Sequence, residues 1–253
     1  MSKLITRRTI VTGAALGAGG LLTGCDALSR NPAVQNVLGL AEDANYSVQR
    51  ALGDRMELAS EYSRADLSPK FRANGTRNPD TTDYNLSADQ GFANWQLRLT
   101  GLFAKPQDFS LASLQAMPQR TQITRHDCVE GWSAIGEWTG VPLKLLLDLV
   151  VLKEKANFLV FHCADRLGGR PYYETIDLLD AYHPQTIIAH RLNGDALPIE
   201  NGAPLRLRVE RQLGYKHAKY VHKIEAVASL DNVGEGKGGY WEDVAGYEWY
   251  AGI

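Results

Sequence analysis

Short strand-like segments separated by turns dominate this sequence, and they constrain its fold more than any other feature. Trp95–Gly101 alternates apolar and polar residues as a half-buried strand does, and Phe158–Phe161 is a continuous apolar run. The other segments of this kind are 121–124, 172–176, 186–189, 205–209 and 224–227. They do not alternate with helices in a regular βαβ rhythm, so we predict an α+β fold with a mainly antiparallel or mixed sheet and short helices.

Local signals mark the short helices and one tight turn. Pro142 precedes an apolar run and predicts a helix beginning near Leu143, since proline suits the first turn of a helix. Ser110 and Asp177 are expected to cap two further helices, because their side chains can accept hydrogen bonds from free backbone N–H groups. Asn193-Gly194 predicts a hairpin turn.

Composition excludes several classes of protein. The chain has 253 residues, of which 44% are hydrophobic, so it can form one large domain or two small ones. A formal net charge of −2 argues against a general nucleic-acid binder, so we expect no nucleic-acid partner. Charged residues make up 22% of the chain and aromatic residues are spread along it, which argues against global disorder.

The first residues have the pattern of an export signal. Lys3, Arg7 and Arg8 are followed by the apolar run Thr9–Leu22, which is shorter than the roughly 20 apolar residues that span a bilayer. The Arg7-Arg8 pair resembles a twin-arginine signal, and the alternative is an ordinary secretory signal. Either signal predicts an exported, periplasmic protein.

Leu22-Thr23-Gly24-Cys25 resembles a bacterial lipobox, in which the cysteine becomes lipidated after cleavage. The alternative is cleavage nearby without lipidation of Cys25. Asp26 resembles the signal that retains some lipoproteins in the inner membrane, so a lipidated Cys25 predicts an anchor there. We therefore divide the chain into a signal with lipobox (1–25), a tether with a helical segment (26–68) and one main domain (69–253).

One cysteine lies in a setting that favours chemistry. Cys128 follows Arg125 and His126 closely, and nearby positive charge stabilises the thiolate, which is the nucleophilic and metal-binding form. The alternative is a buried inert cysteine, although such residues usually lie among aliphatic side chains. Cys163 is the remaining cysteine of the main domain; a disulfide between the two would remove the free thiol of Cys128.

A basic stretch forms the second candidate feature. Residues 206–223 contain six basic residues and one acidic residue, Glu210. The basic residues are Arg206, Arg208, Arg211, Lys216, Lys219 and Lys223. Guanidinium and ammonium groups next to glycine-containing turns are typical of phosphate binding. The alternative is a solvated basic face.

The segment Arg125–Trp132 resembles the molybdenum-binding segment of the sulfite oxidase family of molybdopterin oxidoreductases. The resemblance extends from about Phe71 to Ile253 and implies the molybdopterin-binding fold of that family. It implies that Cys128 is the protein ligand of molybdenum. Arg125 and His126 would then hold the thiolate charge or meet an anionic substrate.

The same resemblance implies a set of cofactor-binding residues. Phe71, Arg72 and Asn74 match an early loop that lines the pterin, although this loop alone could equally be a surface turn. The stretch from Asn201 onwards matches the family's molybdopterin-binding stretch and gives Asn201, Arg206, Tyr215, Lys216, His217, Ala218 and Lys219. Cys163 falls where relatives carry a small polar residue near the pterin, and this departure leaves that contact open.

The resemblance implies an exported enzyme that transfers an oxygen atom to or from a small or protein-borne oxide with a molybdenum–molybdopterin cofactor. The plan is similar to that of periplasmic protein-methionine-sulfoxide reductase catalytic subunits, which draw electrons from a membrane cytochrome b, so we expect a separate membrane redox partner. Alternatives are a sulfite dehydrogenase and a non-catalytic binding lipoprotein. The aromatic C-terminal residues Trp241, Tyr247, Trp249 and Tyr250 are expected to pack on the domain. The alternative is that they border the cofactor mouth or a partner docking surface.

Overall fold

The computed structural model describes residues 31–34, 40, 44, 46–48 and 56–253. The chain divides into two units, Met1–Asp54 and Arg55–Ile253, and the second unit is described below. The twin-arginine pair and Cys25 lie outside the described residues. Within the described part, we find no helix with the length and apolar character needed to cross a membrane.

The first of two sheets in this unit is mixed. Its strand order is β2-β1-β10-β5-β6. The strands are β1 (Gln96–Gly101), β2 (Gln107–Ser110), β5 (Phe158–Leu167), β6 (Arg170–Asp177) and β10 (Val221–Val227). β1 pairs with β10 in parallel and the other neighbours are antiparallel.

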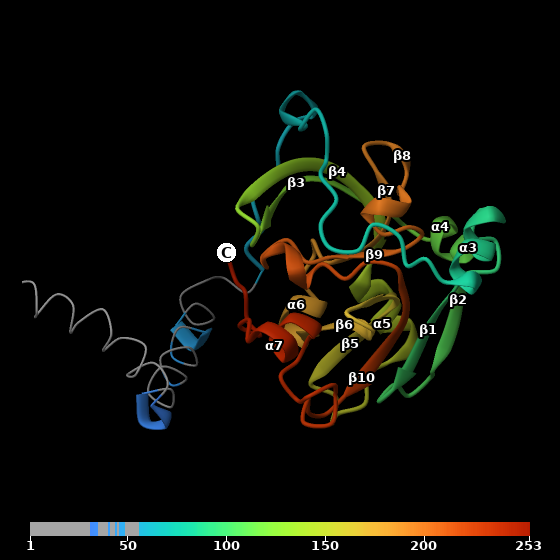
Figure 1. Cartoon of the computed structure of the whole chain (residues 1–253). Coiled ribbons are helices and arrows are strands. Elements are labelled where there is room, and N and C mark those ends of the chain that lie inside the picture. Colours follow the sequence, from blue (N-terminus) through green and yellow to red (C-terminus); the bar gives the residue numbers. More distant parts are fainter. Residues whose placement is uncertain (1–30, 35–39, 41–43, 45, 49–55) are drawn as a thin grey trace, which may run out of the picture. The chain divides into compact units, whose positions relative to one another are not determined.

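The second sheet is antiparallel, with the order β3-β4-β7-β8 and with β9 paired to β7 (Figure 1). Its strands are β3 (Arg120–Cys128), β4 (Trp132–Pro142), β7 (Ile187–Leu192), β8 (Asp195–Ala196) and β9 (Arg206–Arg208). Two sheets with short helices and one parallel pair confirm the predicted α+β class.

The helices are short and their local signals act as predicted. The α-helices are α3 (Thr82–Asp89), α4 (Leu111–Ala116), α5 (Leu143–Val150), α6 (Leu178–Ala181) and α7 (Tyr240–Ala245); the 3-10 turns are η1 (Arg64–Asp66), η2 (Ile199–Asn201) and η3 (Gly214–Lys216). Ser110 accepts a hydrogen bond from the Ser113 amide at 3.1 Å, and Asp177 accepts from the Asp180 amide at 2.8 Å. Asn193 and Gly194 have φ of 54° and 87°, as a hairpin turn between β7 and β8 requires.

The strand β4 was not predicted, because its segment is rich in glycine and tryptophan and lacks clear alternation. Its glycines serve close packing: a Cβ on Gly140 would stand 2.5 Å from the Cα of Ala189 on β7. β3 is also longer than the predicted 121–124 and continues to Cys128, which pairs with Trp132. Cys128 therefore ends a strand of a β-hairpin.

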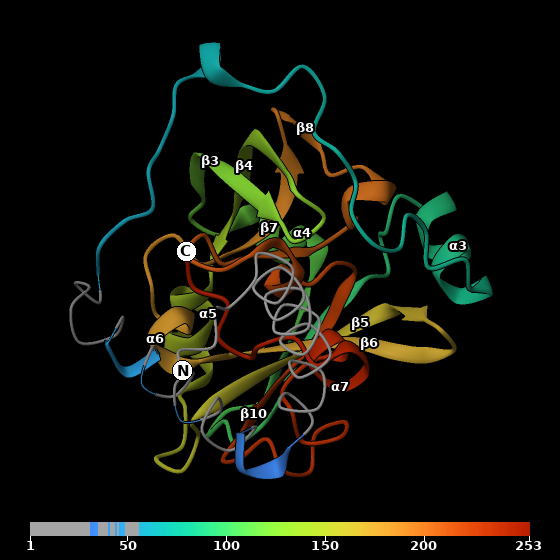
Figure 2. The same ribbon diagram turned by 60° about the vertical axis from the view of Figure 1, so that its left-hand side comes forward.

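The two sheets lie in separate layers, with β3, β4 and β7 in one and β5, β6 and β10 in the other (Figure 2). The larger apolar core includes Leu97, Phe161 and Ile224 of the first sheet, and a smaller core surrounds Trp138 of β4. The turn η3 contacts both β3 and β6 and so bridges the two sheets. This bridge positions the functional site.

The chain before the predicted domain boundary also belongs to this unit. Glu61 forms an isolated β-bridge with Thr124 of β3, and the Ser68 amide donates to the Ile135 carbonyl of β4 at 3.0 Å. The described residues 56–68 of the predicted tether therefore contact the second sheet.

Candidate active site

Cys128 lies at the end of β3, immediately before the turn that leads to β4. Its side chain is buried, with 8% of the residue exposed. Burial raises the pKa of the thiol. Two effects partly oppose this rise: a hydrogen bond from the Glu130 amide to the sulfur, and the positive charge of Arg206. Both cysteines of the unit are free, so no disulfide consumes the thiol of Cys128.

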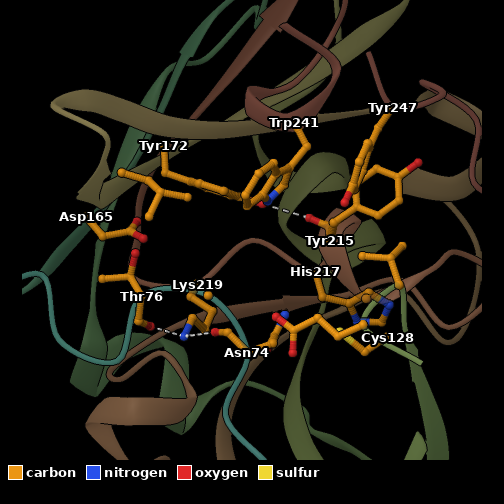
Figure 3. Close-up of a pocket in the computed structure, with 15 residues that line it drawn as sticks. Asn74, Thr76, Cys128, Asp165, Tyr172, Tyr215, His217, Lys219, Trp241 and Tyr247 are labelled. Atoms are coloured by element: carbon orange, nitrogen blue, oxygen red, sulfur yellow. Dashed lines mark hydrogen bonds between the residues drawn. The ribbon is translucent and has the colours of Figure 1, made fainter. Parts of the chain in front are cut away.

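A pocket of about 110 Å³ opens at Cys128 (Figure 3). Four separate parts of the chain contribute to it: the early loop, the end of the β3–β4 hairpin, the β5–β6 strands, and the segments around η3 and α7. The lining residues are Asn74, Gly75, Thr76, Cys128, Val129, Glu130, Asp165, Leu167, Tyr172, Gly214, Tyr215, His217, Lys219, Trp241 and Tyr247.

Cysteine is the soft ligand of this pocket. Among the residues that the structure describes, no group of three or more His, Cys, Asp or Glu side chains is arranged to hold a metal ion. A soft metal bound at Cys128 would therefore take its remaining ligands from a cofactor or from solvent.

Most of the predicted basic stretch is neutralised within the protein. Arg208 pairs with Glu210 at 2.6 Å, Arg211 with Asp180 at 3.2 Å, Lys216 with Glu242 at 2.6 Å, and Lys223 with Glu225 at 3.0 Å. Arg206 and Lys219 form no ion pair in the described part of the chain. These two buried cations are the ones left to bind an anion.

Lys219 lines the pocket and donates to the backbone carbonyls of Asn74 at 2.7 Å and Glu200 at 3.0 Å, and also to that of Thr76. Burial, with a contribution from Arg206, lowers the pKa of the Lys219 ammonium to about 7. The charges of Asp165 and Glu200 oppose this lowering only in part, so no acid fully compensates the ammonium.

Arg206 lies behind the pocket wall and is fully buried. It donates to the Asn201 carbonyl at 3.0 Å and to Asn74 Oδ1 at 3.2 Å, and it lies 5.3 Å from the ring centre of Trp138. Burial, followed by the charge of Arg208, lowers the pKa of Arg206 to about 9. Arg206 thereby fixes the side chain of Asn74 at the pocket.

Two buried donors at this site have no partner in the described part of the chain. They are Nε of Arg206 and Nδ2 of Asn201, and the unpaired Nδ1 of neutral His217 is an acceptor, because its Nε2 donates to the Gln212 carbonyl at 3.0 Å. Buried polar groups are normally hydrogen-bonded, so unpaired donors beside two uncompensated cations fit a polar, anionic ligand. The burial of Asp165, whose pKa is raised to about 6, adds a titratable acid to the same pocket.

This arrangement agrees with comparisons to known proteins. The family model of the oxidoreductase molybdopterin-binding domain matches residues 85–232. The chain belongs to this family. This chain is 37% identical over 237 residues to a protein of Azospira oryzae named as protein-methionine-sulfoxide reductase subunit YedZ1. The match covers 94% of this chain and 84% of that protein.

A solved structure is also similar in part. The crystal structure of the sulfane dehydrogenase SoxCD from Paracoccus pantotrophus matches with a TM-score of 0.49 and 23% sequence identity. The match covers 54% of this chain and 39% of that chain. Membership of the molybdopterin-binding family confirms the resemblance seen in the sequence and identifies the chain as an oxidoreductase with a molybdopterin-binding domain.

The unpaired donors and cations of the pocket suit a molybdopterin, which is polar and phosphorylated. Lys219 would hold its anionic end, with Arg206 behind it, and Asn74 and His217 line the same pocket. Cys128 would bind the metal. When bound, the cofactor supplies two-electron redox chemistry and oxygen-atom transfer at the metal.

The other predicted cofactor residues take various positions. Tyr215 lines the pocket, whereas Ala218 is buried behind it, where it accepts from the Leu207 amide at 2.8 Å. Phe71 packs edge-on against Trp138 at 5.0 Å in the smaller core, and Arg72 lies over the Trp132 ring at 6.0 Å. Neither side chain of that early pair lines the pocket.

Cys163 and Lys216 also lie outside the pocket lining. Cys163 is buried on β5, and burial raises the pKa of its thiol well above the usual value. The ammonium of Lys216 points to Glu242 and Glu174, at 2.6 and 2.9 Å. The structure thus separates Lys216 from the uncompensated cations of the site.

The structure does not bring Arg125 or His126 into the pocket. The side chain of Arg125 is 54% exposed and pairs with Asp127 at 2.9 Å. His126 is buried behind the site, where its Nδ1 accepts from Arg208 at 3.0 Å, and burial holds its pKa well below the usual value. His126 is therefore neutral, and its contact with Arg208 supports the strand that carries Cys128.

Outside the segment Arg125–Trp132, sequence reasoning missed six lining residues as pocket components: Gly75, Thr76, Asp165, Leu167, Tyr172 and Gly214. Trp241 and Tyr247 were left between packing on the domain and bordering the cofactor. Their rings stack at 5.6 Å and both residues line the pocket, where contact with the cofactor stays a prediction. Both lie beyond the segment that the family model matches, so the chain after residue 232 completes the site.

Proposed function

We propose that this molybdopterin oxidoreductase reduces sulfoxides, in particular methionine sulfoxide, by removing the oxygen atom. The relative from Azospira oryzae, named as a subunit of a protein-methionine-sulfoxide reductase, supports this substrate class. The observation that carries the proposal is the character of the pocket next to Cys128.

The pocket at Cys128 suits a neutral substrate. Val129, Trp241 and Tyr247 supply apolar and aromatic surface, and Glu130 supplies a carboxyl group. Of the residues that line the pocket, Lys219 alone is a lysine or arginine, and it donates to three backbone carbonyls. The alkyl groups of a sulfoxide can pack against these aromatic rings, whereas sulfite has no apolar group to place there.

The chain's own residues have separate tasks in this reaction. Cys128 would hold the metal, and Lys219 with the residues around it would hold the phosphorylated end of the cofactor. Trp241 and Tyr247 would orient the substrate and exclude water from it. The balanced reaction converts a sulfoxide, two protons and two electrons into a thioether and water.

The two electrons need a donor, and we propose a separate membrane redox partner such as a cytochrome b. The relative's description as a subunit supports a partner. We also propose export to the periplasm through the Arg7-Arg8 signal and anchoring to the inner membrane through lipidated Cys25. Fractionation of cells that produce a Cys25→Ser variant tests the anchor: release to the soluble periplasm supports it, and unchanged membrane association contradicts it.

The function is tested with purified protein loaded with molybdenum and pterin. A panel of methionine sulfoxide, peptides that contain it, N-oxides and sulfite is assayed with artificial electron donors and acceptors. We expect reduction of sulfoxides and little oxidation of sulfite. Efficient oxidation of sulfite without reduction of any sulfoxide would replace the proposal with a sulfite dehydrogenase, and loaded protein inactive on every compound would favour a binding role.

A further inference from the structure

Tyr172 of β6 separates the active-site pocket from a second, larger cavity. This cavity has a volume of about 550 Å³ and lies between the β5, β6 and β10 strands and the segment 232–244. Among the residues that line the two cavities, Tyr172 is the one they share. Its ring therefore forms a wall between them.

A buried charged cluster lies next to this wall. Lys216 of η3 contacts Glu242 of α7 at 2.6 Å and Glu174 of β6 at 2.9 Å. All three side chains are at most 1% exposed. One ammonium thus meets two carboxyl groups in a region without water contact.

The two carboxyl groups lie close to each other. Glu174 Oε2 and Glu242 Oε2 both lie against the backbone of Gly239. A Cβ atom added to Gly239 would stand 2.5 Å from Glu174 Oε2 and nearer still to Glu242 Oε2. Glu242 Oε2 has no hydrogen-bond partner within the protein. Two carboxylates at this separation in a buried site cannot both be ionised beside one cation, so the cluster holds one proton.

The geometry assigns the proton to Glu174. The shorter contact of Lys216 is to Glu242, which makes those two the ion pair. Burial raises the pKa of Glu174 well above the usual value; Lys216 opposes the rise and the neighbouring carboxyl of Glu242 adds to it. Glu174 is therefore the carboxyl group of this cluster that favours its neutral form.

The other titratable groups around Glu174 do not supply a second cation. Tyr172 and Tyr173 lie on its own strand, and Tyr215 lies on η3 beside Lys216; burial raises the pKa of all three hydroxyls, so they stay neutral. Asp243 of α7 accepts a hydrogen bond from Tyr173 at 2.6 Å. The charge balance of the cluster thus depends on Lys216.

A hydroxyl group connects this acid to the active site. Tyr172 Oη lies 3.4 Å from Glu174 Oε1 and donates to the Tyr215 carbonyl at 3.0 Å. Figure 3 shows this hydroxyl ending beside Tyr215 within the pocket, near Trp241. A proton that leaves Glu174 therefore has a hydroxyl between it and the pocket.

We propose that Glu174 stores a proton and passes it through the Tyr172 hydroxyl into the active-site pocket. The Tyr172 oxygen takes the proton from Glu174 as its own proton moves to an acceptor in the pocket. Glu174 becomes a carboxylate until a proton from solvent returns to it through the hydroxyl of Tyr172, the residue that lines both cavities. This inference rests on the proposed sulfoxide reduction, whose water product needs two protons for every two electrons from the redox partner. The relay supplies one proton at a time.

The stored proton is tested without any turnover. Infrared spectra of the wild-type protein minus those of Glu174→Gln, recorded in H₂O and D₂O at neutral pH, are expected to show the carbonyl stretch of a protonated carboxyl. The band should shift in D₂O and should persist in Glu154→Gln, a control at an exposed position. Its absence from the wild-type difference spectrum would overturn the proposal.

The transfer is tested by steady-state kinetics of the loaded enzyme. Glu174→Gln and Tyr172→Phe are each expected to lower kcat for sulfoxide by about 100-fold with KM and cofactor content unchanged. The wild-type kcat should fall at alkaline pH, and the variants should lack this limb of the pH profile. Tyr182→Phe, at a tyrosine outside both cavities, is expected to behave as the wild type.

Three outcomes separate the two proposals. Wild-type kcat in Tyr172→Phe, with the infrared band present, would show a stored proton that is not used and would overturn the relay. A fall in kcat that leaves the pH profile unchanged would indicate a structural role and would also overturn it. A loaded wild type without sulfoxide reductase activity would remove the proposed function, and the relay with it, while the infrared band would still report the neutral acid.

Discussion

The pKa of Lys219 predicts that anion binding at the cofactor site depends on pH. In the free protein burial lowers this pKa to about 7, and a bound anion would raise it again. The affinity is therefore greatest below pH 7, where the ammonium is already charged, and falls as the pH rises above 7. The protonated fraction drops from about one half at pH 7 to about one hundredth at pH 9, so the affinity should fall about 50-fold, or about 2.3 kcal/mol.

Sulfate is a suitable probe for this prediction, because its charge does not change over that pH range. Calorimetric titration of cofactor-free protein at constant ionic strength measures its affinity. Lys219→Met should bind weakly at every pH, whereas Lys223→Met, which removes a cation paired with Glu225, should follow the wild type. Wild-type affinity that is constant between about pH 6 and 9, or an unchanged slope in Lys219→Met, would refute the reasoning.

Three further substitutions test the site and its support. Cys128→Ser should lose bound molybdenum, measured by elemental analysis, with an unchanged circular dichroism spectrum; full metal content would contradict the assigned ligand. Gly140→Ala should lower the free energy of unfolding by about 3 kcal/mol, because its Cβ would stand 2.5 Å from the Cα of Ala189; an unchanged urea midpoint would contradict this. Arg208→Met should cost about 3–5 kcal/mol in the same assay, since it leaves Glu210 buried without its partner, and a loss below about 1 kcal/mol would contradict that role.

Signals between neighbours in the sequence predicted the local structure well. Ser110, Asp177 and Asn193-Gly194 act through hydrogen bonds or dihedral angles within a few residues, so the sequence contains their full cause. β4 was missed because its glycines are required by contact with β7, a partner distant in the sequence. Strand content thus depends on packing as well as on pattern.

The charges of the site were likewise only partly predictable from the sequence. The basic stretch predicted an anion site, but ion pairs neutralise Arg208, Arg211, Lys216 and Lys223. Glu210 and Glu225 are neighbours in the sequence, whereas Asp180 and Glu242 reach the stretch only after folding, so a count along the sequence cannot include them. The structure therefore reduces six candidate cations to Arg206 and Lys219.

The sequence by itself determined the class of the fold, the family and the position of the thiol, because the Cys128 segment and the strand pattern are local. Tertiary structure alone decided which side chains meet that thiol. It buried His126 behind the site, turned Arg125 to solvent, and brought Trp241 and Tyr172 from distant elements to the pocket. The physical reason is that a pocket forms where two sheets, a bridging turn and the C-terminal segment converge, and no single stretch of chain specifies that convergence.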